Sequence, residues 1–77
     1  MTVTTGNRTL AARARDLANS ASAGSLERKA AGCLAVALGT TNTVTAARKV
    51  LSDITTADIR DRATQMLAEL ADEANAA

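Results

Sequence analysis

The side chains that could carry out chemistry are few, and their types limit the reactions to consider. The chain has one cysteine, Cys33, and no histidine. A disulfide within the chain is therefore excluded, and a zinc site lacks its usual ligands. Cys33 falls on the apolar stripe of a predicted helix, where a buried thiol is inert rather than nucleophilic. Ready labelling of the native thiol would instead favour a catalytic Cys33.

Two carboxylates and four glycines are the remaining candidates for catalytic or cofactor chemistry. Asp58 and Asp61 are three residues apart, which is the spacing of neighbours on one helix face. Acids in the first turn of a helix are, however, typical of stabilisation of the helix dipole. The glycines do not form a phosphate-binding motif. We therefore expect no catalytic, cofactor-binding or metal-binding residues, and we expect that the protein is not an enzyme.

Charge is unevenly distributed along the chain, although the formal net charge is only +1. Residues 1–49 carry seven basic and two acidic side chains, a balance of +5. Residues 50–77 carry two basic and six acidic side chains, a balance of −4. This asymmetry favours attraction between the two halves, within one chain or between chains.

The basic first half leaves nucleic-acid binding open as an alternative function. Residues 26–53 can be interpreted as a helix-turn-helix in a small DNA-binding regulator. No aromatic side chain is present to stack on a base, however, and the second helix begins with Thr43, Thr45 and Ala46 rather than with typical base-reading residues. The basic residues that would contact nucleic acid are Arg8, Arg13, Arg15, Arg48 and Lys49.

Four segments show helical periodicity, and no segment alternates as a strand would. The helices are expected at about residues 7–22, 25–38, 43–53 and 56–74. We therefore predict an all-α fold of four short helices that form two helical hairpins. The apolar stripes that would form the core are Leu10, Ala14, Leu17, Ala18 and Ala21; Leu26, Ala30, Cys33, Leu34 and Ala37; Val44, Ala47, Val50, Leu51 and Ile54; and Ile59, Ala63, Met66, Leu67, Leu70 and Ala74.

Residues at the expected helix ends support these boundaries. Ser25 can cap the second helix, and the segment at 40–43 offers several caps for the third helix. Thr55 and Asp58 have the spacing of a capping box before the fourth helix. Gly39 stands where helices often end in a left-handed residue.

The length of the chain predicts one domain with a small core. We expect a single helical domain over residues 1–77, with residues 1–6 and 75–77 flexible. No Phe, Tyr or Trp enlarges the core, so a partner chain is the expected source of further stability. The N-terminus lacks the apolar segment of a signal peptide, and no apolar run approaches the ~20 residues that span a bilayer. We therefore expect a cytoplasmic protein that does not bind a membrane.

The two halves of the chain resemble each other at an offset of 33 residues, because apolar positions coincide when residues 26–34 are aligned with residues 59–67. Within the second half, LSDITTADIRDRATQMLAEL at residues 51–70 resembles a HEAT repeat. The residues at the corresponding positions are Asp53, Ile59, Arg60, Ala63, Leu67 and Leu70. The resemblance implies a paired-helix protein-interaction module in which Asp53 and Arg60 make stabilising polar contacts. A compact four-helix bundle or an orthogonal array fits the same periodicity.

The second helix contains an uncharged run, AAGCLAVALG, at residues 30–39. A helix that is apolar on every side is normally buried on every side. Either this helix is the centre of the fold, or its outer face meets another chain. We predict a small non-enzymatic interaction, adaptor or regulatory protein that forms a homodimer. The residues expected on the outer face, and therefore at the interface, are Ala31, Gly32, Ala35 and Val36.

Overall fold

The computed structural model describes residues 7–76 and the side chains of residues 7–73. It contains four α-helices, α1 (Asn7–Ser20), α2 (Leu26–Gly39), α3 (Val44–Ser52) and α4 (Ala57–Ala76), and no strand within the described residues. The predicted all-α class is therefore confirmed. The expected flexibility of residues 1–6 and of Ala77 concerns residues outside those described, and α4 continues through Ala76.

Two of the predicted helix caps are confirmed, and two other expectations at helix ends are wrong. The hydroxyl of Ser25 accepts a hydrogen bond from the Arg28 amide at 3.2 Å, and α3 is capped in the same way by Thr43. Gly39 is the last residue of α2 rather than a left-handed residue after it. The capping box at Thr55 is not formed, because α4 begins one residue later than that motif requires.

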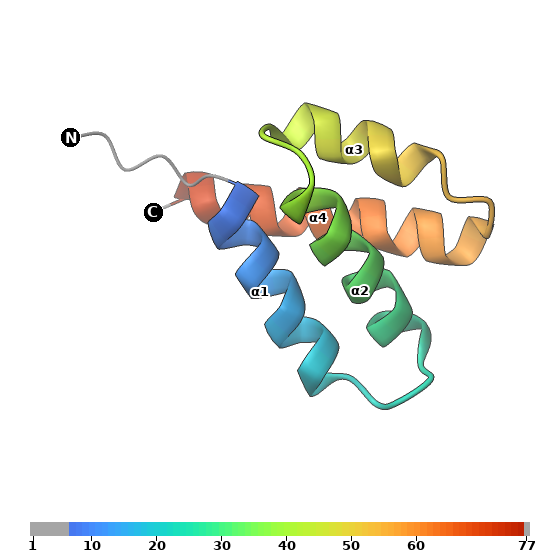
Figure 1. Ribbon diagram of the computed structural model, residues 1–77. Coiled ribbons are helices and arrows are strands. Elements are labelled where there is room, and N and C mark those ends of the chain that lie inside the picture. Colours follow the sequence, from blue (N-terminus) through green and yellow to red (C-terminus); the bar gives the residue numbers. More distant parts are fainter. Residues whose placement is uncertain (1–6, 77) are drawn as a thin grey trace.

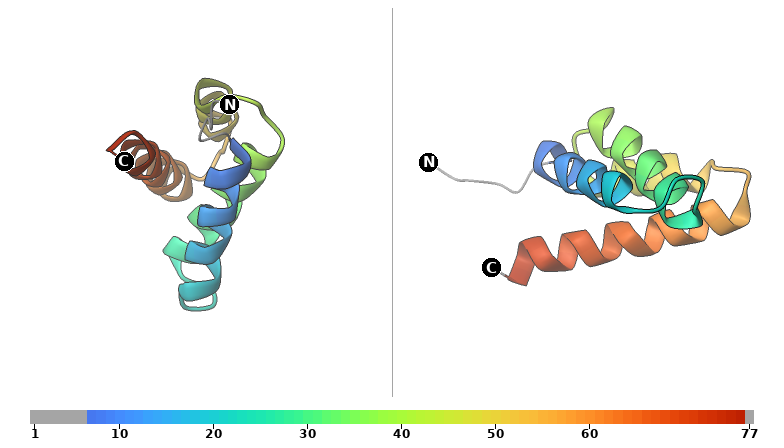
Figure 2. Two further views of the ribbon diagram at one scale, coloured as in Figure 1. Left: turned by 90° about the vertical axis from the view of Figure 1, so that its left-hand side faces the viewer. Right: turned by 90° about the horizontal axis from the view of Figure 1, so that it is seen from below.

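The four helices form two hairpins, with the second lying across the first (Figure 1). Helices α1 and α2 run antiparallel side by side, and α3 and α4 form the other pair. Helix α2 contacts each of the other three helices. The views in Figure 2 show α4 passing beneath the α1–α2 pair while α3 crosses at one end of it. Helix α2 is thus the central helix of the fold.

The buried core follows from this central position of α2, which contributes more buried residues than α1 or α3. Leu34, Leu38, Leu51 and Leu67 are the largest side chains that are fully buried. Alanine methyls fill much of the remaining space, in keeping with a chain that has no aromatic residue. Among residues 7–73, the buried apolar residues are Leu10, Ala11, Ala14, Ala30, Ala31, Leu34, Ala35, Ala37, Leu38, Ala47, Leu51, Ala63, Met66, Leu67 and Leu70.

Among the predicted core positions whose side chains are described, three are exposed instead, and the side chain of Ala74 lies outside those described. Leu17, Leu26 and Val50 each keep about two fifths of their surface accessible to solvent. They lie at the margins of their apolar stripes, and the crossing of the two hairpins leaves these margins uncovered. Helical periodicity identified the correct side of each helix but not how far its neighbours extend around it.

Polar contacts join helices that are distant in sequence. The Nδ2 group of buried Asn7 donates to the Thr41 carbonyl at 2.9 Å, to the Thr41 hydroxyl at 2.9 Å and to the Thr43 carbonyl at 3.0 Å. These bonds hold the first turn of α1 against the segment between α2 and α3. A buried amide with several acceptors fixes this junction more specifically than apolar packing alone.

Two ion pairs attach α4 to the first hairpin. Arg62 donates two hydrogen bonds to Glu27, with Nε–Oε1 and Nη2–Oε2 distances of 2.6 and 2.7 Å. This contact lowers the pKa of Glu27 and raises that of Arg62. Arg13 pairs with Glu73 at 3.2 Å near the other end of α4. The second pair joins the basic first half to the acidic second half, as the charge distribution predicted.

Candidate interaction surfaces

An apolar groove lies between the exposed side of α2 and the corner where α3 leads into α4. It has a volume of about 550 Å³. We call it the apolar groove and define it by Gly32, Cys33, Val36, Val50, Ile54 and Ile59. Its walls come from two hairpins, so the groove exists only in the folded chain.

The groove combines protruding and recessed apolar groups. Val36 is 64% exposed and Val50 is 41% exposed, so both side chains project at its edge. Ile54 and Ile59 are half-buried and pack against the core. Cys33 is also half-buried. A partner of matching shape can therefore pack both on the projecting valines and into the recess beside them. Such packing would remove apolar surface from contact with water.

Charges of both signs stand beside the groove. Arg28 and Lys29 are part of its lining on the α2 side. On the opposite side, exposed Asp53 and Asp58 directly precede the lining residues Ile54 and Ile59 in sequence. The lining of the groove therefore includes basic groups on one wall, and the residues that precede two lining isoleucines of the other wall are acidic.

The four residues predicted at an interface divide into two pairs. Ala31 and Ala35 are buried inside the fold, so their expected position on an outer face is wrong. The helical wheel assumed one inner face, whereas packing on three sides of α2 covers a wider arc. Gly32 and Val36 lie in the apolar groove and remain accessible. Whether they meet a second chain stays a prediction.

Gly32 has no packing reason within the chain. A Cβ built at this position meets no other atom within 4 Å. Glycine inside a helix costs roughly 0.5–1 kcal/mol relative to alanine. The fold alone therefore does not explain the absence of a side chain at this point on the groove wall.

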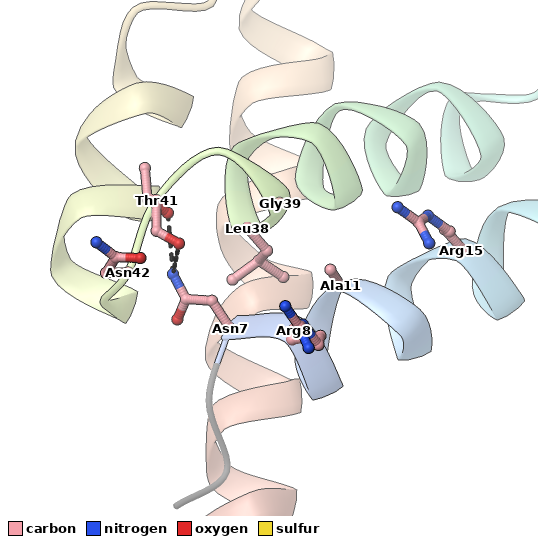
Figure 3. A pocket seen from close by; sticks show the side chains of 8 residues that line it. All are labelled: Asn7, Arg8, Ala11, Arg15, Leu38, Gly39, Thr41 and Asn42. Atoms are coloured by element: carbon pink, nitrogen blue, oxygen red, sulfur yellow. Dashed lines mark hydrogen bonds between the residues drawn. The ribbon is translucent and has the colours of Figure 1, made fainter.

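A second recess lies where α1 meets the turn between α2 and α3 (Figure 3). Its volume is about 640 Å³. The residues that line it are Asn7, Arg8, Ala11, Arg15, Leu38, Gly39, Thr41 and Asn42, and we call it the arginine pocket. It contains two arginines and no acidic residue, which distinguishes it from the apolar groove.

The five basic residues predicted to contact nucleic acid do not form one surface. Arg8 and Arg15 share the arginine pocket. Arg13 faces α4 instead, where it pairs with Glu73. Arg48 and Lys49 are exposed on α3 and line neither recess. The structure thus brings together two of the five.

Residues considered for catalysis are not gathered into one site. Cys33 is in the apolar groove, whereas Asp61 forms an ion pair with Arg60 at 3.4 Å on the surface of α4. Within the described part of the chain, no three cysteine or carboxylate side chains are placed to hold a metal ion together. Among residues 7–76, no helix is long and apolar enough to cross a membrane.

Sequence reasoning missed several residues of both surfaces. Val50 and Ile54 were assigned to the core, because they lie on the apolar stripe of α3. Asn7 and Asn42 carry no periodic signal that would connect residues more than thirty positions apart. The exposed margin of an apolar stripe becomes visible only when the crossing of the hairpins is known.

Comparison with known proteins does not assign this chain to a family. No protein-family model, curated protein or solved structure matches it. The HEAT-repeat resemblance therefore rests on the residues that suggested it. Of the two polar residues it implied, Arg60 forms an ion pair with Asp61 at 3.4 Å.

Proposed function

We propose that this chain is a non-enzymatic interaction protein that forms a homodimer through the apolar groove. The observation that carries the proposal is the exposed apolar surface around Val36, 64% accessible at the edge of a recess that contains further apolar residues. Contact with a partner would bury this surface, and the burial would stabilise the complex by about 25 cal/mol per Å² of apolar area. We also propose that the protein works in the cytoplasm, where a single unpaired thiol is typical.

The shape of the groove favours a second copy of the chain as its occupant. In a twofold dimer the same surface is used on both subunits, so it must be complementary to itself. Val36 and Val50 supply the projections, and the space between the α2 wall and the α3–α4 corner supplies the recess. Each subunit can therefore insert its projecting valines into the recess of the other.

The charges beside the groove agree with the same occupant. A rim of one sign would repel its own copy, because both subunits present the same charges. Here Arg28 and Lys29 line one wall, and the exposed residues Asp53 and Asp58 each precede a lining residue of the other wall in sequence. A twofold arrangement can place the basic wall of one subunit against the acidic side of its partner.

Gly32 adds support from energetics. Its lack of a side chain destabilises the helix without improving packing inside the chain. A partner helix that approaches the α2 wall closely would use this space. The small core supports the proposal as well, because chains of this size often gain needed stability from association.

The experiment that tests the proposal is a comparison of solution mass before and after Val36→Glu. We expect the native chain to form a species of about 15.6 kDa, twice the 7.8 kDa of one chain. Val36→Glu should dissociate it, because the substitution places a charge on an apolar side chain of the contact. Light scattering with refractive-index detection suits this measurement, since no Trp or Tyr absorbs at 280 nm.

A matched pair of neutral substitutions controls for general effects of polarity. Val50 and Leu17 are both 41% exposed, but Leu17 lies between α1 and α4, away from the groove. We expect Val50→Gln to weaken the dimer and Leu17→Gln to leave it unchanged. A native chain that remains monomeric at all accessible concentrations contradicts self-association, and equal effects of the two substitutions contradict the assignment to this groove.

A further inference from the structure

We propose that the arginine pocket is a binding site for a phosphate group. The pocket shares no lining residue with the apolar groove, so the proposal is independent of dimer formation. It rests on four properties of the recess: the presence of two arginines on one face of α1, the absence of an acid from the described lining, the bonding of two nearby helix carbonyls by threonines, and a wall held in place by hydrogen bonds.

The first property is the placement of Arg8 and Arg15. They are seven residues apart on α1, which is two helical turns and about 10.5 Å along the axis. This spacing puts both side chains on the same face of the helix. Figure 3 shows them along the side of α1 that faces the end of α2. Side chains of this length can reach a common ligand between them.

The second property is the lack of an acidic partner. The residues that line the pocket include no Asp or Glu. Within residues 7–73, the ion-paired arginines are Arg13, Arg60 and Arg62, and no carboxylate is within ion-pair distance of Arg8 or Arg15. Asp16, next to Arg15 in sequence, lines the recess between α1 and α4 instead. The positive charge of the pocket is therefore not neutralised by these residues.

The third property concerns a simpler role for the two arginines. Basic side chains often bond to the last carbonyls of a helix, and α2 ends at this pocket. Threonines already bond to two of the carbonyls in its last turn. Thr40 donates from its amide and its hydroxyl to the Val36 carbonyl at 3.0 and 2.9 Å, and Thr41 donates to the Ala37 carbonyl at 2.7 Å. The guanidinium groups are not required as caps for these carbonyls.

The fourth property is the order of the opposite wall. Asn7 is buried and donates to Thr41 and Thr43, as Figure 3 shows for Thr41. The segment that carries Asn42 is therefore held at a defined distance from α1. Asn42 is exposed and lines the pocket, where its amide can provide a further donor. A wall fixed before binding reduces the entropic cost of ordering a ligand.

The chemistry of these donors favours phosphate over a carboxylate. Each guanidinium presents a planar fork of N–H groups that pairs with two oxygens. Two forks from different directions match a tetrahedral group with three or four oxygens, whereas one fork suffices for a carboxylate. The ligand could be a small phosphorylated molecule or the phosphate backbone of a nucleic acid, since both present the same group.

The test combines two probes with two matched double variants. Inorganic phosphate is titrated at constant ionic strength into the native chain and into each variant, and NMR follows the backbone amide shifts of Gly39, Thr41 and Asn42, which line the pocket and are present in every variant. A labelled DNA duplex is titrated separately at several salt concentrations. Arg8→Gln/Arg15→Gln removes the pocket charges, and Arg13→Gln/Arg48→Gln removes the same charge elsewhere. Glutamine has nearly the helix propensity of arginine, so circular dichroism should show all variants folded.

We expect saturable shifts with phosphate that chloride does not produce, and that only the pocket variant loses. If the duplex also binds, the pocket variant should lower the magnitude of its salt slope by about 1.8, for two lost phosphate contacts. That result assigns the site to backbone phosphates, whereas phosphate shifts without duplex binding assign it to small ligands. The absence of phosphate-specific shifts, or equal losses in both double variants, overturns the proposal.

Discussion

Adjacent residues of α2 with similar composition have opposite environments. Ala31 and Ala35 are buried by other helices of the same chain, whereas Gly32 and Val36, one position further along, lie in the open apolar groove. All four are small or apolar, and none carries a polar atom in its side chain. The comparison teaches that hydrophobicity marks a helix as central but does not show which of its faces the chain itself covers.

The difference between these two sides comes from what crosses α2. On the buried side, α1 and α4 pack closely enough to cover even alanine methyls. On the exposed side, α3 ends and the chain turns at Ile54 toward α4, so the covering layer stops short of Val36. The groove is the space that this turn leaves beside the central helix.

Substitution of Leu34 on the buried side of α2 should have the largest effect on stability. Leu34 is fully buried in α2, and Leu34→Ala should lower the free energy of unfolding by about 2–5 kcal/mol. Because one small core provides only ~3–5 kcal/mol, this loss is comparable to the whole stability of the chain. Val36→Ala, measured at concentrations where the chain is monomeric, should change stability by less than about 0.5 kcal/mol. Urea denaturation followed by circular dichroism distinguishes the two. Similar losses for both would mean that Val36 is packed rather than exposed.

Asn7→Ala tests how the buried side is anchored at the end of α2. The substitution removes hydrogen bonds to Thr41 and Thr43 and leaves their carbonyls without this donor. We expect a loss of about 1–3 kcal/mol in the free energy of unfolding. Asn42→Ala, an amide that is exposed nearby, is the control and should stay within about 0.5 kcal/mol of the native chain. If both variants are equally stable, the Asn7 contacts do not hold α1 against the α2–α3 segment.

Gly32→Ala, on the exposed side of α2, should change the stability of the monomer in the opposite direction. A methyl group at this position has no atom within 4 Å apart from its chain neighbours and the backbone of its own helix, and it improves helix propensity by about 1 kcal/mol. The monomer should therefore melt at a temperature roughly 4–8 °C higher, measured by circular dichroism. The dimer should weaken, because the methyl occupies the proposed contact. Gly24→Ala is the control. Gly24 has φ of 77°, and alanine there should destabilise. A lower melting temperature for Gly32→Ala, at concentrations where the chain is monomeric, would show that its space is already filled.

The smallest expected effect concerns the ion pair that ties α4 to the start of α2. Hydrogen bonding from Arg62 lowers the pKa of Glu27 in the folded chain. The corresponding stability is present above the ordinary pKa of a glutamate and is lost as the pH falls through the lowered value. Glu27→Gln should therefore reduce the melting temperature slightly at neutral pH and have less effect in acid. The matched variant Glu73→Gln tests the other exposed pair. If the effect of Glu27→Gln on the melting temperature does not depend on pH, the stability does not come from the ionised Glu27 carboxylate.

The elements of the fold could be predicted because their signals are local. Periodicity located all four helices. Ser25 caps α2 and Thr43 caps α3, and both caps could be predicted because each joins residues only three positions apart. The positions of Ala31, Ala35 and Val50 relative to the surface could not be predicted in the same way. They depend on how one hairpin crosses the other, which no short sequence pattern encodes.

The candidate sites show the same division. Arg8 and Arg15 could be grouped from their spacing on one helix, but the turn residue Asn42 joins them only through the long-range contacts of Asn7. Gly32 and Val36 were expected on an outer face, whereas Ile54 and Ile59 from the second hairpin complete the groove. Local patterns identified one wall of each surface, and tertiary packing supplies the opposite wall.

The location of Cys33 gives the chain a natural reporter. It is the only cysteine in the sequence, and it lies half-buried in the apolar groove. The rate at which a thiol reagent modifies it should therefore measure how much of the groove is uncovered at a given moment. In a chain without Trp or Tyr, the Cys33 thiol allows the covering of the apolar groove to be followed by labelling kinetics. No fluorescent residue or label has to be introduced into the protein first.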